Sequence, residues 1–457
     1  MGARLTDSDL YAHLWGTPEL RAVFDERARL ATWLEILVAL AQAQASLDII
    51  PAQAADAIAR GATVEALDLV FVAEETRRTG HSTLGLIRGL ERALPPDAAG
   101  WIYFGATVQD LTDTWMAVAM RSVGHIAWRD LRAIEATALG LARAHRDTPM
   151  AGRTHGQQGS PITFGLKAAG WADELRRHLD RLREGAPRWL VGQLAGATGN
   201  LGFFGELGPE LRARFCRSLG LGDPGISWTA SRDRVAEFVH VLAMIAASLA
   251  RIGSEVYELQ RTEIGELREA ASAEGVGSIT MPHKRNPEVA EHLVTLSRLV
   301  RAQHAVLLEG MVQEHERDGR GWKAEWVAFP EACLLTGTAL ALGRSLLDGL
   351  EVDAAAMRRN LETAGSLASE RLLALLAPVL GKHRAQARLQ ALIVEARSAG
   401  IDLEEAVRGA EDLGKSVDPK ALASVFGEPD TGTSGAMVDD VLARADAARS
   451  LEGDDRP

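Results

Sequence analysis

The stretch RVAEFVHVLAMIAASLA, residues 234–250, decides the fold. Its apolar residues recur every three to four positions, for example at Val235, Phe238 and Leu242, which is the spacing of one helical face. From 238 to 250 the apolar residues are so dense that more than one face must be buried. The stretch therefore predicts a long helix that runs through the middle of a helical bundle.

Prolines indicate where other long helices fit. A proline inside a helix costs about 3 kcal/mol, and the 16 prolines leave long free intervals. These intervals are 97–148, 162–186, 225–281 and 288–329, and they are rich in Ala, Leu, Arg and Glu. Alternating, strand-like runs are nearly absent. We expect an all-α protein whose long helices, buried on several faces, form the core of an oligomer, with one large monomeric helical domain as the alternative.

The chain is expected to divide into three helical domains. Shorter helices over 1–103 end near the turn ALPPDAAG, the long helices occupy 104–350 with a loop over 275–287, and shorter helices follow over 351–457. Proline and glycine interrupt helices. The last domain is therefore expected to be broken at Pro378, Gly381 and Gly400.

Composition argues against several classes of function. The chain has 457 residues and a formal net charge of −12, which argues against general nucleic-acid binding. Cys216 and Cys333 form no cluster, and no histidine pair has convincing metal-ligand spacing, so we expect neither a disulfide scaffold nor a metal site. The N-terminus lacks an apolar core, and the longest apolar stretch, 241–250, is too short to cross a bilayer. We expect a soluble, cytoplasmic protein with no membrane contact.

Lysine is scarce, since only six of the 50 Lys and Arg residues are lysines. One of them, Lys284, lies in the segment GSITMPHKRNP, residues 277–287, with Ser278 and Asn286. Two prolines and nearby glycines predict a loop there, and a loop rarely needs such polar residues together for structure. We interpret the segment as a functional loop with a basic oxygen and a cationic anion clamp. Pro287 would start the next helix, whose N-terminus favours anions.

This loop resembles the signature G-S-S-x-M-P-x-K-x-N-P of the fumarase/aspartase superfamily. It departs from the signature at one fixed position, where Ile279 replaces the second serine. Segment 104–114 (FGATVQDLTDT) is similar to the family's first substrate segment, and 152–157 (GRTHGQ) is similar to its second. The stretches 228–234 and 314–326 also follow the pattern, so the resemblance covers nearly the whole chain.

The resemblance implies anti elimination across a succinyl Cα–Cβ bond with release of fumarate and no cofactor. Ser278 would be the base, His155 the acid on the opposite face, and Glu291 the carboxylate that orients this histidine. Removal of a proton next to a carboxylate creates an aci-carboxylate, which needs fixed positive charge and hydrogen-bond donors. The residues that the resemblance assigns to substrate binding are Lys284, Asn286, Thr107, Thr154, Gln157, His81 and Arg232. It also implies that three subunits of a homotetramer share each site and that the substrate is a small anionic dicarboxylate.

Two branches of the superfamily resemble the chain most, the adenylosuccinate lyases and the 3-carboxy-cis,cis-muconate cycloisomerases. Residues 314–326 and 349–361 favour the cycloisomerases. His155, Glu291 and His81 favour the eliminating lyases, because cycloisomerases typically have Trp, no glutamate and Asn at these places. The segment DGRGWK departs from the D-S-S-x-x-R pattern that helps adenylosuccinate lyases to bind a nucleotide phosphate.

A β-eliminating lyase for an N-substituted or C-substituted succinate is the preferred interpretation. Lactonisation of carboxymuconate is the alternative. A structural protein recruited from a lyase is a remote third, because the residues expected to act in catalysis are all present. The leaving group stays open. Val108 and Ile279 replace serines of the family pattern and place apolar side chains near the expected carboxylate site.

Overall fold

The computed structural model describes residues 4–271, 280–281, 283–363, 368–414 and 417–452. The elements in chain order are η1 (Leu5–Asp7), η2 (Ala12–Leu14), α1 (Pro18–Phe24), α2 (Glu26–Ala45), α3 (Ala52–Gly61), η3 (Val64–Ala66), α4 (Leu69–Thr79), α5 (Leu84–Ala93), α6 (Pro96–Ala99), α7 (Val108–Ala144), β1 (Pro149–Thr154), β2 (Gln157–Thr163), α8 (Phe164–Trp189), η4 (Gly205–Leu207), α9 (Gly208–Ser218), α10 (Asp233–Leu259), β3 (Leu267–Arg268), α11 (Glu288–Glu309), α12 (Gly319–Asp348), β4 (Glu351–Val352), α13 (Ala354–Thr363), α14 (Ser369–Leu380), α15 (Lys382–Ala399), α16 (Leu403–Gly409), α17 (Glu411–Gly414), α18 (Pro419–Val425) and α19 (Ser434–Ser450).

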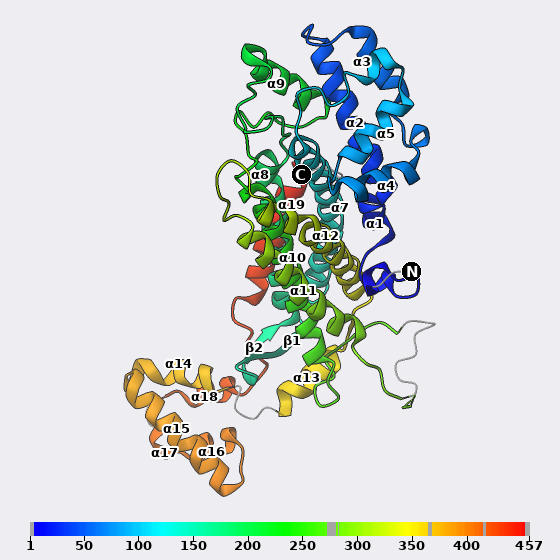
Figure 1. Cartoon of the computed structure of the whole chain (residues 1–457). Coiled ribbons are helices and arrows are strands. Elements are labelled where there is room, and N and C mark those ends of the chain that lie inside the picture. Colours follow the sequence, from blue (N-terminus) through cyan, green and yellow to red (C-terminus); the bar gives the residue numbers. More distant parts are fainter. Residues whose placement is uncertain (1–3, 272–279, 282, 364–367, 415–416, 453–457) are drawn as a thin grey trace.

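Long helices form the centre of the molecule (Figure 1). α10 packs against α8, α11 and α12, while α7 packs against α8 and α12. α10 contains the stretch 234–250, and its side chains Phe238, Leu242 and Ile245 are completely buried. Burial of one such side chain stabilises the fold by about 1.5–3 kcal/mol. The predicted all-α class with a bundle of long central helices is confirmed.

Prolines limit the helices less than expected. Pro187 lies inside α8, Pro330 inside α12 and Pro378 inside α14, so the predicted break at Pro378 is wrong. Burial of apolar neighbours on α12, such as Phe329, offsets the lost backbone hydrogen bond. Glycine behaves as predicted. Gly400 ends α15 in the left-handed conformation, with φ of 69°, which glycine adopts without a steric penalty.

The structure contains two short strand pairings, although the sequence showed almost no strand-like runs. β1 and β2 form an antiparallel hairpin between α7 and α8, with an irregularity between Ala151 and Arg153. β3 and β4 form a second, two-residue pairing. The hairpin carries the segment 152–157 and therefore matters for the site.

The bundle separates two groups of smaller elements (Figure 1). α2, α3, α5 and α9 gather near one end, and the hairpin and α13 lie at the opposite end. α14–α18 lie beyond the hairpin end, with a small hydrophobic cluster of their own, whereas α19 returns along the bundle and packs on α8. The apolar residues of α2–α5 belong to the same large cluster as the bundle. The domain limits at 103 and 350 stay predictions.

Two of the described helices, α10 and α12, are long and apolar enough to cross a membrane by length and composition. They are also core helices of the bundle, and 67% and 61% of their apolar windows are buried in protein. Helices that are apolar on all sides are typical of the core of a large protein as well as of membranes. The apolar character of α10 and α12 is therefore explained by packing.

Candidate active site

The predicted site segments lie at two ends of one long helix. Segment 104–114 begins α7, and the hairpin follows its C-terminus. α7 has 37 residues, which at about 1.5 Å per residue makes it about 55 Å long. Thr107 and His155 of one chain are therefore too far apart to contact one small substrate. We call these two places the first-segment end and the hairpin end.

At the first-segment end, Thr107 is the N-cap residue of α7. Its backbone N–H donates to Asp110 Oδ2 at 2.9 Å, and Asp110 also accepts from the N–H groups of Ala195 (2.8 Å) and Gly196 (3.2 Å). Burial raises the pKa of Asp110 to about 6, against the opposing effect of these donors. Arg317 Nη1 donates to the Thr107 hydroxyl at 3.0 Å. The expected substrate-binding threonine is thus held in place from two sides.

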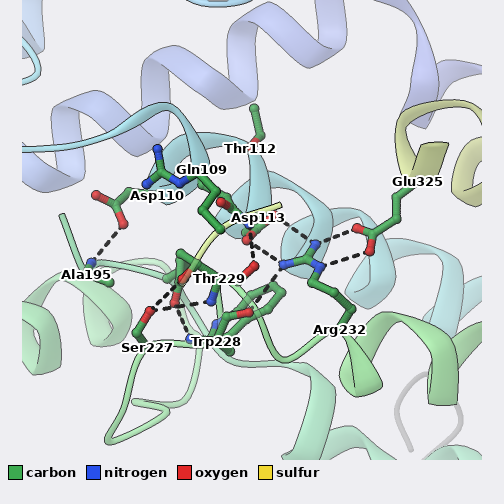
Figure 2. A network of polar contacts seen from close by, with 12 residues as sticks. Gln109, Asp110, Thr112, Asp113, Ala195, Ser227, Trp228, Thr229, Arg232 and Glu325 are labelled. Carbon is green, nitrogen blue, oxygen red and sulfur yellow. Dashed lines mark hydrogen bonds and ion pairs between the residues drawn. The ribbon is translucent and has the colours of Figure 1, made fainter. Parts of the chain in front are cut away.

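Arg232 lies beneath this end and is completely enclosed (Figure 2). Its Nε and Nη2 donate to Glu325 on α12, its Nη1 and Nη2 donate to Asp113 on α7, and its Nη1 also donates to the Trp228 carbonyl. The side chains of all three charged residues are at most 1% exposed. All five guanidinium N–H groups are used within the chain, so none is left for a substrate. The placement of Arg232 does not support the predicted substrate contact.

The charges of Asp113, Glu325 and Arg232 depend on one another, because all three side chains are buried. Burial raises the pKa of the Asp113 and Glu325 carboxyls, and Arg232 opposes that shift. Burial also acts against the charge of Arg232, but Asp113 and Glu325 raise its pKa above the usual value. Arg232 therefore stays charged and joins α7, α12 and the start of α10.

Replacement of Arg232 by methionine is expected to lower the free energy of unfolding by about 3–5 kcal/mol, because two buried carboxyls lose their cation. Guanidinium denaturation followed by circular dichroism measures this. Arg251→Met is the matched control on the same helix, since Arg251 pairs with Glu174 at the surface and is half exposed. The control is expected to cost less than about 1 kcal/mol. Equal losses in the two variants would contradict the role of the Arg232 network.

His81 lies exposed before α5 and acts as a cap. Its Nδ1 accepts the backbone N–H groups of Thr83 (3.3 Å) and Leu84 (3.2 Å). A neutral ring that accepts at Nδ1 carries its proton on Nε2. The cap therefore fixes the ring as a donor through Nε2.

At the hairpin end, His155 and Gly156 form the two-residue turn of the hairpin. Both have positive φ, 52° and 72°, which defines a type I′ turn. Thr154 pairs with Gln157 across the turn, and all four residues are exposed. None of the described residues forms a hydrogen bond with the His155 ring. Thr154, His155 and Gln157 are thus exposed at the tip.

An ion pair fixes the hairpin close to its turn. Arg153 donates to both carboxylate oxygens of Glu266, at 2.6 and 2.8 Å, and Glu266 is completely buried. Asn360 on α13 also donates to Glu266, at 2.7 Å. Two parallel N–H···O bonds set orientation as well as distance. The tip is therefore carried on a rigid support.

The signature loop is described in part. Ser278 lies outside the described residues. Lys284 is exposed, Asn286 Nδ2 donates to Glu288 Oε1 at 3.2 Å, and Glu291 is exposed in the first turn of α11. No described hydrogen bond or ion pair joins Glu291 to His155. As predicted, Lys284 and Asn286 lie just before a helix that starts after Pro287.

The N-terminus of α11 is occupied from within the chain. Glu269 accepts the backbone N–H groups of Val289 (3.2 Å) and Ala290 (2.7 Å). Gln260 accepts the N–H of Glu269 and donates to the Arg285 carbonyl. The carboxylate of Glu269 thus takes two of the free N–H groups that the sequence offered to an anion. The side chains of Lys284 and Asn286 remain for that purpose.

The sequence interpretation missed the contribution of Arg317 and Asp110. Arg317 lies in the stretch 314–326, which served to compare family branches, and Asp110 lies in segment 104–114. A helix-start pattern of threonine followed three residues later by an acid indicates a capping box and would have identified Asp110. The pairing of Arg317 with Thr107 joins residues 210 positions apart, and no local signal indicates it.

Comparisons with known proteins show the family of the chain. A family model described as a lyase matches residues 15–301. The N-acetyl-S-(2-succino)cysteine lyase of Dickeya dadantii is 40% identical over 386 residues, which are 84% of this chain and 85% of that protein. The adenylosuccinate lyase of Methanothermobacter thermautotrophicus is 37% identical over 434 residues, 94% of this chain and 96% of that protein.

A solved structure extends the likeness to three dimensions. The crystal structure of β-carboxy-cis,cis-muconate cycloisomerase from Acinetobacter calcoaceticus is 31% identical and superposes with a TM-score of 0.87, covering 95% of this chain and 100% of that one. The signature loop, the central bundle and these likenesses lead to the same result. The chain belongs to the fumarase/aspartase superfamily of lyases.

Proposed function

We propose that the protein catalyses anti β-elimination from a 2-substituted succinate and releases fumarate. The observation that carries this proposal is the tip of the hairpin. His155 stands exposed there on a rigid support, with a ring that no described residue engages. A positioned imidazole can donate a proton to a leaving atom that it contacts.

The reaction divides between two faces of the substrate. Ser278, as an alkoxide, removes the proton from the carbon next to the one that bears the leaving group. The electron pair forms the double bond by way of an aci-carboxylate, which Lys284 and Asn286 stabilise by charge and hydrogen bonding. The leaving atom takes the electron pair of its broken bond and a proton from His155. Glu291 orients His155, and Thr107, Thr154, Gln157 and His81 bind the substrate.

We propose sulfur as the leaving atom, with nitrogen as the alternative. The likeness to an N-acetyl-S-(2-succino)cysteine lyase supports sulfur. Segment 318–323 (DGRGWK) departs from the D-S-S-x-x-R pattern that helps adenylosuccinate lyases to bind a nucleotide phosphate. This difference makes adenylosuccinate itself a poor candidate for the substrate. A thiol is also a better leaving group than an amine, because the conjugate acid of the departing thiolate is the stronger acid, with a pKa of about 8.5.

The proposed site is shared between subunits of a cytoplasmic, cofactor-free homotetramer. The length of α7 supports sharing, since one chain holds the first-segment end about 55 Å from the hairpin end. An apolar surface supports assembly: Leu299, Val306, Leu308, Met311 and Val312, on and just after α11, are all exposed. Exposed apolar patches of this kind are typical of protein–protein interfaces.

Lactonisation of carboxymuconate is the second candidate. Residues 314–326 resemble the cycloisomerases, and the TM-score of 0.87 to a solved cycloisomerase supports the same comparison. That reaction does not need the proposed acid. It therefore predicts turnover of carboxymuconate and indifference to the loss of His155.

Incubation with a set of substituted succinates tests the proposal. The set contains an S-alkyl succinate, an N-alkyl aspartate, adenylosuccinate and carboxymuconate, and the ultraviolet absorbance of fumarate reports elimination. The S-alkyl succinate is expected to give the fastest release, with the thiol detected in equal amount. If only carboxymuconate is converted, the proposed elimination is wrong and lactonisation is the function.

A further inference from the structure

A small aromatic cavity lies beside the first-segment end. It has a volume of about 60 Å³. Its lining includes Arg29, Trp33, Ser82, Thr112, Trp115 and Trp326. Ser82 follows the proposed substrate contact His81, and Thr112 lies one helical turn after Val108 on α7. The cavity therefore adjoins the proposed substrate site.

Arg29 contributes an unpaired cation to this cavity. No described residue forms a hydrogen bond or an ion pair with its guanidinium, and its Nε is buried without an acceptor. Burial lowers the pKa of Arg29, and Glu26 on the same helix opposes that shift only partly. The guanidinium lies over the Trp115 ring, 4.5 Å from its centroid. Stacking on an aromatic face stabilises the cation but leaves its N–H groups for a carboxylate.

The tryptophans supply the rest of the recognition chemistry. Trp33 Nε1 is buried and donates to none of the described residues. Trp115 and Trp326 add apolar ring surface, and Trp326 is 36% exposed at the rim. A buried N–H without an acceptor costs free energy, as does a partly buried cation without an anion. Both costs disappear when a ligand brings a carboxylate and an acceptor on a short apolar body.

We propose that this cavity binds the leaving group of the substrate and selects one that carries a carboxylate on a short apolar body. Arg29 binds the carboxylate, and the tryptophans enclose the apolar part. The volume suits a chain of a few heavy atoms and excludes a nucleotide. This inference rests on the proposed elimination and adds to it a rule for the leaving group.

Two isosteric substrates test the rule. One is the thioether of succinate with 3-mercaptopropionate, and the other is the same compound with its distal carboxylate replaced by a carboxamide. The kcat/KM ratio of acid to amide, measured by fumarate release, is expected to be at least about 10 in the wild type, since a charge-assisted hydrogen bond is worth that much. Arg29→Gln is expected to bring the ratio close to 1, and Arg29→Lys to retain part of it.

Arg27→Gln is the matched control. Arg27 lies on the same helix, points to solvent and pairs with Glu65 at 3.0 Å, so its loss is expected to leave the ratio unchanged. A ratio that is the same in Arg29→Gln and the wild type, while fumarate is still released, overturns the cavity proposal and leaves the elimination intact.

Binding without turnover separates the two proposals. The quench of tryptophan fluorescence by free 3-(methylthio)propionate, with its amide as the neutral control, is expected in the wild type and lost in Arg29→Gln. Arg29-dependent quenching with no fumarate from either substrate would support the cavity and overturn the elimination. Absence of quenching and of acid preference would overturn the cavity.

Discussion

His155→Asn is expected to lower kcat for fumarate release by about 1000-fold. The proposed acid is lost, and general acid–base groups contribute about 10²–10⁴-fold. The substitution suits the turn, because asparagine tolerates the left-handed conformation that His155 adopts, with φ of 52°. Asn-Gly is also the favoured pair for a type I′ turn. The hairpin is therefore expected to keep its shape while its chemistry disappears.

Thermal denaturation and the activity of a control variant provide the checks on His155→Asn. The melting temperature is expected to match that of the wild type, because Arg153 and Glu266 still hold the strand next to the turn. Gln158→Ala, an exposed change on β2, serves as the control and is expected to retain full activity. Unchanged kcat for fumarate release in a folded His155→Asn protein would exclude this histidine as the acid and assign that role to another residue.

Ser278→Ala is expected to lower kcat by about 10⁴-fold, because the proposed base is lost and general acid–base groups contribute about 10²–10⁴-fold. The residues that would stabilise the aci-carboxylate, Lys284 and Asn286, are unchanged in this variant. Substrate binding is therefore expected to persist. Single-turnover fumarate release measures the loss, and equilibrium dialysis with the S-alkyl succinate measures the retained binding.

Thr280→Ala is the matched control for the base. Thr280 is an exposed hydroxyl residue of the same loop, at the position that varies in the signature. Its loss is expected to change kcat less than about threefold. Light scattering is expected to give the same oligomer mass for both variants. A fully active Ser278→Ala protein would move the base to another residue.

The fold could be predicted where local chemistry decides it. The dense apolar run of α10 predicts a buried helix, and left-handed glycines such as Gly400 end helices without help from other elements. Pro330 shows the limit, since α12 continues through it because packing on neighbouring helices outweighs a local cost. The β1–β2 hairpin was not predicted from the sequence, because its turn is His-Gly and not the commoner Asn-Gly.

For the candidate site too, the sequence predicts the residues of local motifs but not the contacts between distant segments. Motifs in segments 152–157 and 277–287 name His155, Lys284 and Asn286, because these segments resemble a substrate segment and the signature loop of the family. Motifs do not reveal pairings across the fold. Arg232 looked like a substrate contact, and its use of every N–H within the chain depends on Asp113 and Glu325, which lie on two other helices.

The length of α7 has a consequence for how specificity can change. One end of this helix carries the cavity proposed to choose the leaving group, and the other precedes the hairpin proposed to carry the acid. Because the proposed site joins these two ends from different chains, each subunit serves two sites at once, with its cavity in one and its His155 in another. The rigid rod thus makes a substitution near Arg29 or Trp326 act on a site whose proposed acid comes from a different subunit.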